Sequence, residues 1–311
     1  MARTLLVVNP ASRAGATERR FARIERELRA ALGSYDLAWT KGPRDAVRIA
    51  REAATAGYAR LLVGGGDGTA SEIATGLLGA GRNEDVTLGF LPLGTGGDLL
   101  RTLGIPRVLG GALAILRAGR TREIDAGRLE YRDDHGQRAL TFFVNETSAG
   151  LAGLVAQLVT RATKALGPTG SFLLGTLRGI ASAQPHAARV RVDGELAHEG
   201  PLVLATASNG RYFGGGMHVA PNASPSDGLF HAVIIPGMAK PELLARLPSL
   251  YVGRHLAAPG VRELRGRIVE VEPLGDAPLH RFECDGEPLG SAPLRAELVP
   301  RALRVISPEA T

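Results

Sequence analysis

The feature that most constrains the fold is an apolar segment that runs directly into a glycine-rich turn and then into a helical pattern. Residues 61–63 have the composition of a buried strand, residues 64–69 form the turn, and residues 70–78 have the apolar spacing of a helix. Glycines at such a junction allow positive φ and let a ligand approach the main chain closely. Backbone NH groups at a helix N-terminus attract anions, so this stretch predicts a phosphate site.

Asp67 is an unexpected residue in such a loop, because its carboxylate would repel a bare phosphate. It fits if a magnesium ion accompanies the phosphates and Asp67 contacts that ion or its water shell. The alternative is a tight strand-to-helix turn in which Asp67 or Thr69 only caps the helix. The loop by itself leaves both interpretations open.

Strand and helix patterns alternate over the first part of the chain. Strands are predicted at residues 4–8, 36–40, 60–63 and 87–91, and helices at 16–32, 45–56, 69–78, 99–103 and 108–118. Short loops between them imply a parallel sheet covered on both faces. Ligands in such sheets bind beyond the carboxyl ends of the strands. The loops that begin at Asn9, Gly64 and Pro92 all fall at that edge.

After Arg122 the pattern changes to closely spaced strands with glycine and proline turns, which are typical of an antiparallel sandwich. Strands are predicted at 123–131, 140–144, 187–192, 202–208, 229–235, 267–272, 280–284 and 294–299, and helices at 151–166, 171–183 and 240–250. The first two helices are predicted to be separated by a break at residues 167–170. We therefore expect two domains, residues 1–126 and 127–311, and leave open a return of the last residues to the first domain.

Composition restricts the partners and the compartment. The net charge is +6 and the pI is about 10.0, which suits nucleic acid, nucleotides or an anionic membrane surface. The aromatic content of 5% argues against a base-stacking surface. Cys284 is the only cysteine, so an intrachain disulfide is excluded and a cytoplasmic setting is expected. No apolar run is long enough to span a bilayer.

The sequence Asp-Gly-Glu occurs twice, at residues 193–195 and 285–287. Two carboxylates that flank a glycine can supply a general base and an orienting or metal-binding partner. Asp-Gly also favours tight hairpin turns, and we interpret the first copy as such a turn. At the second copy a turn competes with a catalytic role.

Two further acids are candidates with equally good structural explanations. The loop at residues 222–229 offers carbonyl groups and the carboxylate of Asp227, which suit a hydrated divalent ion, but an Asx turn explains it as well. Asp125 lies near the expected domain junction, where a salt bridge and catalysis are both open. Cys284 is expected in the core, because the neighbouring charge of Asp285 disfavours a reactive thiolate.

Other common sites are excluded by their missing motifs. The seven histidines form no helical i, i+4 pair of the kind that binds zinc. The chain has no G-x-x-x-x-G-K-[ST] loop, and the dinucleotide fingerprint G-x-G-x-x-G does not follow the first strand.

Four segments together resemble the diacylglycerol kinase and sphingosine kinase catalytic family, most closely its bacterial lipid kinase branch. They are residues 65–69 (Gly-Gly-Asp-Gly-Thr), 92–98 (Pro-Leu-Gly-Thr-Gly-Gly-Asp), 103–106 (Leu-Gly-Ile-Pro) and 285–287 (Asp-Gly-Glu). The likeness runs from Asn9 to the final strands. NAD kinases share the first segment, whereas the Pro-Leu-Gly-Thr-Gly loop is more specific.

The resemblance implies a phosphofructokinase-like α/β nucleotide domain, a C-terminal antiparallel β-sandwich, and phosphoryl transfer from ATP with Mg²⁺ to a lipid hydroxyl. It implies a proton acceptor at Asp285 or the adjacent Glu287 and a supporting acid at Asp125. It implies a structural magnesium held, largely through carbonyl groups, by Ser224, Asp227 and Leu229. The residues that it implies for the ATP site are Asn9, Pro10, Ala11, Ser12, Arg13, Thr40, Gly65, Gly66, Asp67, Gly68, Thr69, Ala70, Ser71, Glu72 and Thr95.

Two residues depart from the family pattern. Gly97 stands where the family usually has Asn, which removes a side-chain amide near the nucleotide. Arg13 stands where the first motif usually has Gly, which narrows that turn and adds a cation for phosphate.

The expected setting is cytoplasmic, with peripheral attachment to an anionic membrane surface and a lipid with a free hydroxyl as substrate. Nucleic acid is not expected as a partner, and the oligomeric state, including a homodimer, stays open. The alternatives are an NAD kinase and a nucleotide- or lipid-binding regulator that has lost catalysis.

Overall fold

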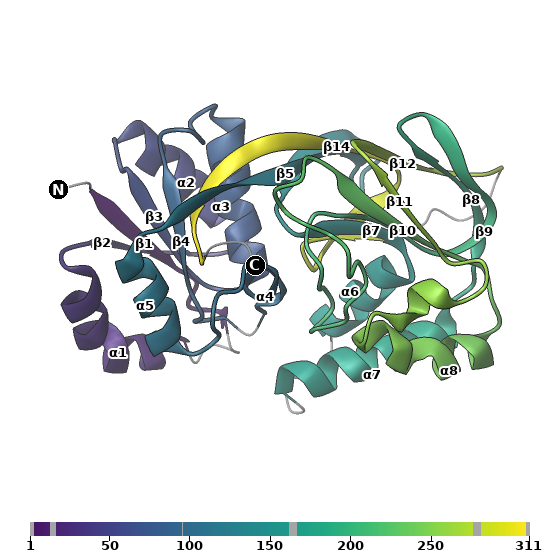
Figure 1. Cartoon of the computed structure of the whole chain (residues 1–311), viewed down its shortest axis with the longest axis horizontal. Helices are drawn as coiled ribbons and strands as arrows, with labels where there is room; N and C mark the ends of the chain where they lie inside the picture. Colours follow the sequence, from purple (N-terminus) through teal and green to yellow (C-terminus); the bar gives the residue numbers. More distant parts are fainter. Residues whose placement is uncertain (1–2, 13–16, 95, 162–166, 276–280, 309–311) are drawn as a thin grey trace. The chain divides into compact units, whose positions relative to one another are not determined.

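In the computed structural model the chain forms two compact units, one made of Met1–Ala126 with Pro300–Thr311 and the other of Gly127–Val299. The structure describes every residue except 1–2, 13–16, 95, 162–166, 276–280 and 309–311. The first unit is α/β and the second is rich in antiparallel strands, as the sequence predicts (Figure 1).

The first unit is built on a parallel sheet. Its strands follow the order β2-β1-β3-β4, with bounds β1 (Thr4–Val8), β2 (Asp36–Trp39), β3 (Arg60–Gly64) and β4 (Thr87–Leu91). The last residues of the long strand β14 (Glu287–Ile306) extend this sheet, because Arg304 and Val305 pair in parallel with Thr87 and Leu88 of β4. The end of the chain is therefore part of the first unit.

Helices cover both faces of this sheet. Helices α1 (Thr17–Leu32) and α5 (Leu109–Ala118) lie together on one face, and α2 (Asp45–Thr55) and α3 (Asp67–Gly79) on the other (Figure 1). Leu6, Leu62, Leu91, Leu113 and Ile306 form part of the buried core between the sheet and α1 and α5. This arrangement fixes the carboxyl ends of β1, β3 and β4 at one edge, where the loops after them meet.

The second unit is a sandwich of two antiparallel layers. One layer contains β11 (Arg262–Gly266), β10 (Phe230–Pro236), β9 (Glu195–Ser208), β7 (Glu146–Gly150) and β13 (Arg281–Cys284). The other contains β6 (Arg138–Phe143), β5 (Thr121–Arg132), β14, β12 (Ile268–Pro273) and β8 (His186–Val192), and the long strands β9 and β14 pair with strands of both. Phe143, Phe230 and Phe282 are fully buried in the core of the sandwich.

Three helices pack on the outer side of the first layer. They are α6 (Leu151–Arg161), α7 (Gly167–Ser182) and α8 (Lys240–Tyr251), the last followed by the short 3-10 helix η3 (Arg254–Ala257). Val203 of β9 and Val233 of β10 point toward these helices, whereas Leu202 and Ile234 point into the sandwich core. None of the described helices is long and apolar enough to cross a bilayer.

Several sequence predictions for the second unit are wrong in detail. Strand β7 was not predicted because Glu-Thr-Ser-Ala-Gly has no apolar alternation, yet four of its five residues are buried in the middle of the layer. Strand β11 was not predicted either, because Arg-Glu-Leu-Arg-Gly is mostly charged. The two helices expected around a break at residues 167–170 exist, but α6 ends at Arg161 and α7 already begins at Gly167, so the predicted break falls at the wrong residues.

Candidate active site

The two glycine-rich loops of the first unit pack backbone against backbone. The NH of Gly94 donates to the carbonyl oxygen of Gly65 over 3.1 Å. A Cβ atom added at Gly94 would lie 2.3 Å from the nitrogen of Gly66, and one added at Gly65 would lie 2.4 Å from Oγ1 of Thr69. Only glycine permits the approach of Gly94 to the backbone of Gly66, so Gly94 is required for the contact between the loops, whereas Gly65 makes room for the side chain of Thr69 in its own loop.

The side chain of Asp67 completes this contact. Its Oδ2 accepts hydrogen bonds from the NH groups of Gly97 and Asp98, each over 3.0 Å, and its Oδ1 accepts one from Leu99 over 3.3 Å. Asp67 therefore caps the N-terminus of α4 (Asp98–Thr102) rather than that of its own helix α3. The sequence predicted Asp67 or Thr69 as a cap of the helix that follows; Asp67 instead caps α4 and so joins two loops that are far apart in the sequence.

The surroundings of Asp67 make it a site that a cation would stabilise. Burial, reinforced by the charge of Asp98, raises the pKa of Asp67 to about 6, against the opposing effect of the three backbone NH donors. Carboxylate oxygens are a ligand type that suits Mg²⁺. Because three NH groups already use the two oxygens of Asp67, contact through a metal-bound water fits better than a direct bond. Over the described residues, no group of three or more His, Cys, Asp or Glu side chains is arranged to hold a metal.

The loop after β1 is attached to the same edge. Nδ2 of Asn9 donates to Oγ1 of Thr69 over 3.4 Å, and Oδ1 of Asn9 accepts the NH of Ala11 over 2.9 Å. Oγ of Ser12 donates to the carbonyl oxygen of Asn9, which closes the turn around Pro10. The NH of Thr40 donates to the carbonyl oxygen of Val8 over 2.9 Å, so the end of β2 lies beside this turn. The structure thus brings the predicted residues Asn9, Pro10, Ala11, Ser12, Thr40, Gly65, Gly66, Asp67, Gly68 and Thr69 to one edge of the sheet.

Other predicted nucleotide residues serve the packing of α3 in this structure. The carboxylate of Glu72 accepts the NH groups of Arg44 and Ala46 over 2.9 and 3.1 Å, and so caps α2. Ala70 is buried, and Ser71 follows it in α3. Arg13 and Thr95 lie outside the described residues.

Gly97, which stands where the resemblance predicts Asn, adopts a backbone conformation that favours glycine. Its φ is +155°, and a Cβ atom there would lie 3.1 Å from Nε of Arg107. Glycine therefore suits the backbone conformation at this position, and in that conformation the NH of Gly97 donates to Asp67.

We expect Gly97→Ala to destabilise the protein by about 1–3 kcal/mol, because a side chain is strained at this φ. Gly110→Ala is the matched control, since Gly110 lies in α5 with nothing within 4 Å of a new Cβ atom. Chemical denaturation of both variants measures the difference. A Gly97→Ala protein as stable as the Gly110→Ala protein would show that the strain is absent.

Asp125 has a structural partner within the first unit. It is 1% exposed, and its Oδ1 accepts the NH of Arg301 over 2.7 Å. Arg301 has a φ of +50°, so Asp125 holds a strained residue of β14 against β5. This contact gives Asp125 a structural role, and its supporting role in catalysis stays a prediction.

Asp285 lies in the tight turn of the β13–β14 hairpin. Cys284 pairs with Glu287, and the two turn residues Asp285 and Gly286 have φ values of +47° and +85°, as a type I′ turn requires. The carboxylate of Asp285 is buried and accepts three backbone NH groups: Val144 on Oδ2, and Asn145 and Glu146 on Oδ1, each over 2.9 Å. Glu287 is exposed at the far side of the turn.

The first Asp-Gly-Glu copy has the same geometry, as predicted for a hairpin turn. Asp193 and Gly194 have φ values of +51° and +84°, and the carboxylate of Asp193 accepts the NH groups of Arg267 and Ile268. Backbone geometry alone therefore does not distinguish the two copies. The difference lies in the acids that surround Asp285.

Two glutamates that the sequence reasoning missed are buried beside Asp285. Glu146 of β7 is fully buried, and its carboxyl group lies beside those of Glu283 and Asp285. Glu283 of β13, 3% exposed, accepts hydrogen bonds from Oγ of Ser148 and from the NH of Gly286. Burial and the charge of Glu283 raise the pKa of Glu146 well above its ordinary value, and burial also raises the pKa of Glu283. We infer that Glu146 holds a proton and Glu283 the charge, because a bond between two carboxyl groups needs one donor.

The carboxyl pair formed by Glu146 and Glu283 predicts that the stability of the protein depends on pH. Because the folded-state pKa of Glu146 exceeds the unfolded value, its contribution to stability is fully present below the unfolded value and is lost as the pH rises through the folded value. We expect Glu146→Gln, which keeps a donor for Glu283, to match the wild type at pH 4.5 and to be more stable at pH 8.

Thermal unfolding of the wild type and Glu146→Gln across this pH range measures the effect. Glu195→Gln is the control, because it makes the same substitution at an exposed glutamate of the same unit. If the unfolding temperatures of the wild type and Glu146→Gln differ by the same amount at every pH, Glu146 does not hold the proton.

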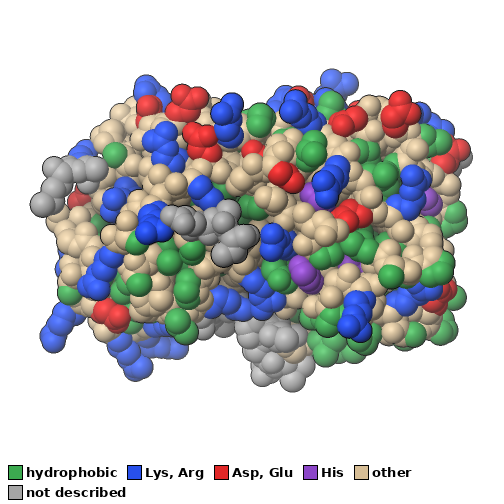
Figure 2. All heavy atoms as spheres, viewed as in Figure 1, with side chains coloured by type: hydrophobic (Ala, Val, Ile, Leu, Met, Phe, Trp, Pro, Cys, Tyr) green, Lys and Arg blue, Asp and Glu red, His purple; other side chains and the backbone are tan. Residues whose placement is uncertain are grey.

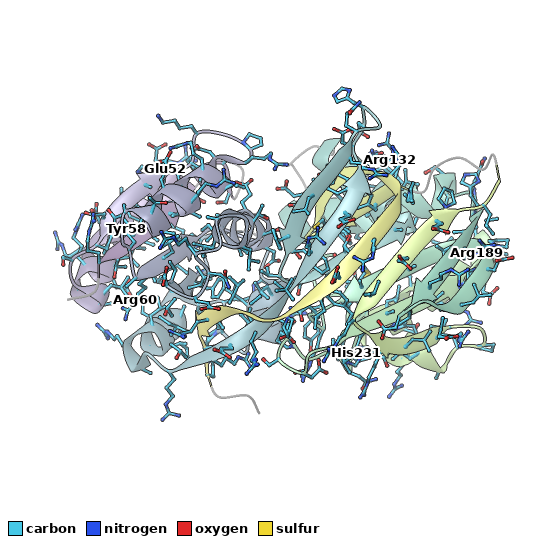
Figure 3. The ribbon with its side chains drawn as sticks, turned by 90° about the horizontal axis from the view of Figure 1, so that it is seen from above. Glu52, Tyr58, Arg60, Arg132, Arg189 and His231 are labelled. Carbon is cyan, nitrogen blue, oxygen red and sulfur yellow. The ribbon has the colours of Figure 1, made fainter. Side chains whose placement is uncertain are left out.

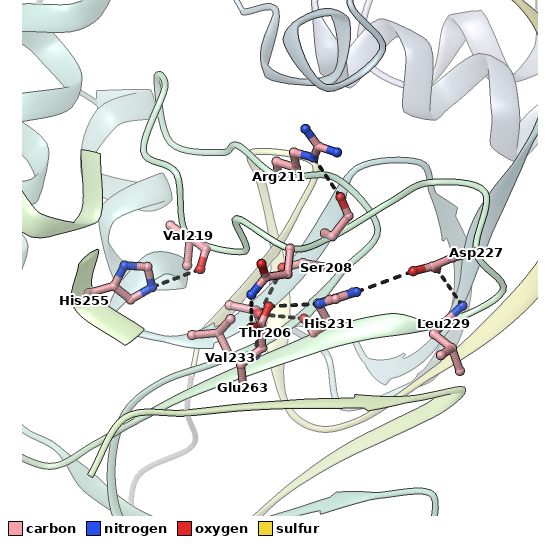
Figure 4. Close-up of polar contacts among 12 residues, drawn as sticks. Thr206, Ser208, Arg211, Val219, Asp227, Leu229, His231, Val233, His255 and Glu263 are labelled. Atoms are coloured by element: carbon pink, nitrogen blue, oxygen red, sulfur yellow. Dashed lines mark hydrogen bonds and ion pairs between the residues drawn. The ribbon is translucent and has the colours of Figure 1, made fainter. Parts of the chain in front are cut away.

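The loop predicted to hold a structural magnesium forms an Asx turn. Oδ1 of Asp227 accepts the NH of Leu229 over 3.1 Å, and Oδ2 lies 3.5 Å from Nε2 of the buried His231 (Figure 4). His231, labelled in Figure 3, lies on β10, and its Nδ1 lies 2.9 Å from Oε1 of Glu263. Ser224 lies in the same loop, half-buried. The observed hydrogen bond is that of an Asx turn. Carbonyl groups together with the carboxylate of Asp227 also suit a hydrated cation, so the magnesium site stays a prediction.

Both halves of the chain match known families. Residues 3–129 match the diacylglycerol kinase catalytic domain, and residues 145–307 match the YegS C-terminal NAD kinase beta sandwich-like domain. Cys284 is buried in the core of the second half, as predicted.

Relatives with similar length show the same relationship. The chain is 34% identical over 273 residues to a Chromohalobacter salexigens protein named "Probable lipid kinase YegS-like", with 87% of this chain and 82% of that protein covered. It is 32% identical over 267 residues to "Lipid kinase YegS" of Escherichia coli K12, with 86% and 83% covered. A crystal structure of a diacylglycerol kinase from Bacillus anthracis str. Sterne has the same fold, with a TM-score of 0.74, 24% identity, and 99% and 97% of the two chains covered. The chain therefore belongs to the bacterial, YegS-like lipid kinase branch of the diacylglycerol kinase family.

Proposed function

We propose that the protein is an ATP- and Mg²⁺-dependent kinase that transfers the γ-phosphoryl group of ATP to the hydroxyl group of a diacylglycerol-like lipid. The observation that carries this proposal is the junction of the two glycine-rich loops, which Asp67 holds together at the N-terminus of α3. Such a junction presents backbone NH groups and one carboxylate to a metal-bound phosphate.

The loop residues would bind and position the nucleotide phosphates. A helix leaves its first NH groups without intrahelical acceptors, and α3 is 13 residues long, so its N-terminus favours anions. Asp67 would hold the water shell of Mg²⁺, with Asp98 as the second nearby charge. Magnesium, when bound with ATP, neutralises charge that develops on the phosphoryl oxygens.

The turn at residues 285–287 of the second unit would supply the base for the lipid hydroxyl group, which accepts the phosphoryl group. The lipid hydroxyl oxygen forms a bond to the γ-phosphorus, the bond from that phosphorus to the bridging oxygen breaks, and ADP leaves. Asp285 takes the proton of the hydroxyl group. The NH groups from residues 144–146 fix the carboxylate, which supports Asp285 rather than the exposed Glu287 as the base.

The remaining features of the proposal concern metal and location. Ser224, Asp227 and Leu229 would hold a structural Mg²⁺ through carbonyl groups and one carboxylate. The net charge of +6 supports action at the anionic surface of the cytoplasmic membrane. Asn9, Ser12 and Thr40, at the edge that holds the loops, would line the nucleotide site together with Arg13 and Thr95.

Incubation with ATP radiolabelled at the γ position, magnesium and a total lipid extract tests the proposal. We expect one labelled phospholipid whose formation needs both ATP and magnesium. Label in no lipid would refute the lipid kinase. ATP binding without transfer to any acceptor would instead identify a regulator that has lost catalysis.

NAD is the second acceptor to test, because the C-terminal half matches a sandwich domain described as NAD kinase-like. An otherwise identical reaction with NAD in place of lipid is expected to give no labelled NADP. Formation of labelled NADP would instead identify the protein as an NAD kinase.

A further inference from the structure

The solvent-facing sides of α7 and α8 are apolar. On α7, Leu173 and Leu177 lie one turn apart and are 42% and 40% exposed. On α8, Leu244 and Tyr251 lie two turns apart and are 45% and 37% exposed, and the following Val252 is 61% exposed. We refer to these five residues as the α7–α8 face. Figure 2 shows hydrophobic side chains at the lower edge of the view, where Figure 1 places both helices.

Packing inside the unit does not account for this face. The opposite sides of both helices already supply Ile180 and Leu243 to one buried cluster, together with Val203 and Val233 of the sheet. A helix at the surface normally directs polar residues outward once its inner side is packed. Here Leu244 points outward directly after Leu243 points inward, so α8 has apolar residues on both sides.

Cations border the α7–α8 face. Arg178 follows Leu177 on α7, Lys240 begins α8, Arg254 stands two residues after Val252, and all three are exposed. Nζ of Lys240 donates to the carbonyl oxygen of Ala181 at the end of α7, which joins the two helices. Glu242, the acid of α8, is paired with Arg246 over 2.7 Å. The border is therefore cationic.

We propose that the α7–α8 face docks the protein on an anionic lipid bilayer, with its leucine side chains and Tyr251 in the interface and Arg178, Lys240 and Arg254 on the headgroups. This inference rests on the proposed function, because a kinase of membrane lipids must reach its acceptor at the bilayer. Apolar side chains that enter the interface and cations that face anionic headgroups are the two contributions that peripheral helices combine. Aromatic residues such as tyrosine favour the same depth.

Vesicle co-sedimentation without ATP tests the docking face. The wild type is expected to bind vesicles of equimolar phosphatidylglycerol and phosphatidylcholine, and to bind pure phosphatidylcholine vesicles more weakly. Leu173→Glu/Leu177→Glu should weaken partitioning at least about tenfold, since two leucines that would enter the bilayer interface are replaced by anions. Leu140→Glu/Leu196→Glu is the matched control, because these leucines are 44% and 53% exposed on strands of the same unit. Equal loss in both double variants, or no loss in either, would overturn the proposal, as would equal binding to both kinds of vesicle.

A spectroscopic measurement places the contact directly. Trp39 is the only tryptophan, so Trp39→Phe/Leu177→Trp carries a single probe on the α7–α8 face. Its emission should shift to shorter wavelength when anionic vesicles are added. An unchanged emission maximum under conditions where the protein sediments with vesicles would show that another surface makes the contact.

Two further measurements separate this proposal from its alternatives. If Leu173→Glu/Leu177→Glu converts a wild-type dimer to a monomer and leaves vesicle binding intact, the face is a contact between two copies and the proposal is wrong. The same variant should still phosphorylate a short-chain diacylglycerol dispersed in water, because docking is not needed there. Vesicle binding through this face without transfer to any lipid would refute the proposed function alone. Transfer with unaltered vesicle binding in the variant would refute the docking face alone.

Discussion

Asp67→Asn should reduce phosphoryl transfer by at least about 10²–10³-fold while the protein stays folded. The carboxylate joins the two glycine-rich loops through three NH groups and is the charge nearest to the predicted metal-bound phosphates. Asparagine keeps the shape but has one acceptor oxygen and no charge. Steady-state kinetics with saturating ATP and a dispersed diacylglycerol measures the loss, and circular dichroism checks the fold.

Asp45→Asn is the matched control for this experiment. Asp45 also accepts a backbone NH, that of Lys41 over 2.8 Å, and it also lies in the first turn of a helix of the same unit. We expect its removal to leave turnover within a few-fold of the wild type. Full activity of Asp67→Asn, or equal losses in both variants, would contradict the proposed role of Asp67 in phosphoryl transfer.

Asp285→Asn should lower kcat by about 10²–10⁴-fold and leave ATP binding nearly unchanged. The change removes the proton acceptor, whereas the loops that would bind ATP belong to the other compact unit. Measured separately, kcat and the dissociation constant for ATP distinguish these effects. A variant with weakened ATP binding and normal kcat would move the base elsewhere.

The chain supplies its own control in the other Asp-Gly turn. Asp193 has the same backbone conformation and also accepts backbone NH groups, so Asp193→Asn should carry a similar stability cost, about 1–3 kcal/mol, without the loss of kcat. Glu287→Gln tests the adjacent acid. If Glu287→Gln loses more activity than Asp285→Asn, Glu287 is the base.

The first unit could be predicted well from the sequence because its signals are local. Each strand is a short apolar run, each helix has a clear apolar side, and the glycines mark the ends of β3 and β4. What the sequence does not show is that Gly94 and Gly65 touch, or that Asp67 caps α4. Those contacts join segments that are distant along the chain.

The second unit was harder to predict, because several of its strands depend on tertiary context. β7 is a central strand of mostly small or polar residues, and β14 runs for 20 residues through Gly290 and three prolines, which look like strand ends. The pair formed by Glu146 and Glu283 follows from the pairing of β7 with β13, which no local pattern reveals. The one available signal was the acid Glu146, which stands two residues after Val144, the end of the strand predicted at residues 140–144.

Transfer of a γ-phosphoryl label to a defined short-chain diacylglycerol, compared among the wild type, Asp67→Asn and Asp285→Asn, tests the central claim most directly. We predict labelled lipid phosphate in amounts equal to the ADP formed by the wild type, and almost none from either variant. Equal labelling by all three proteins, or label recovered only as free phosphate, would contradict the account.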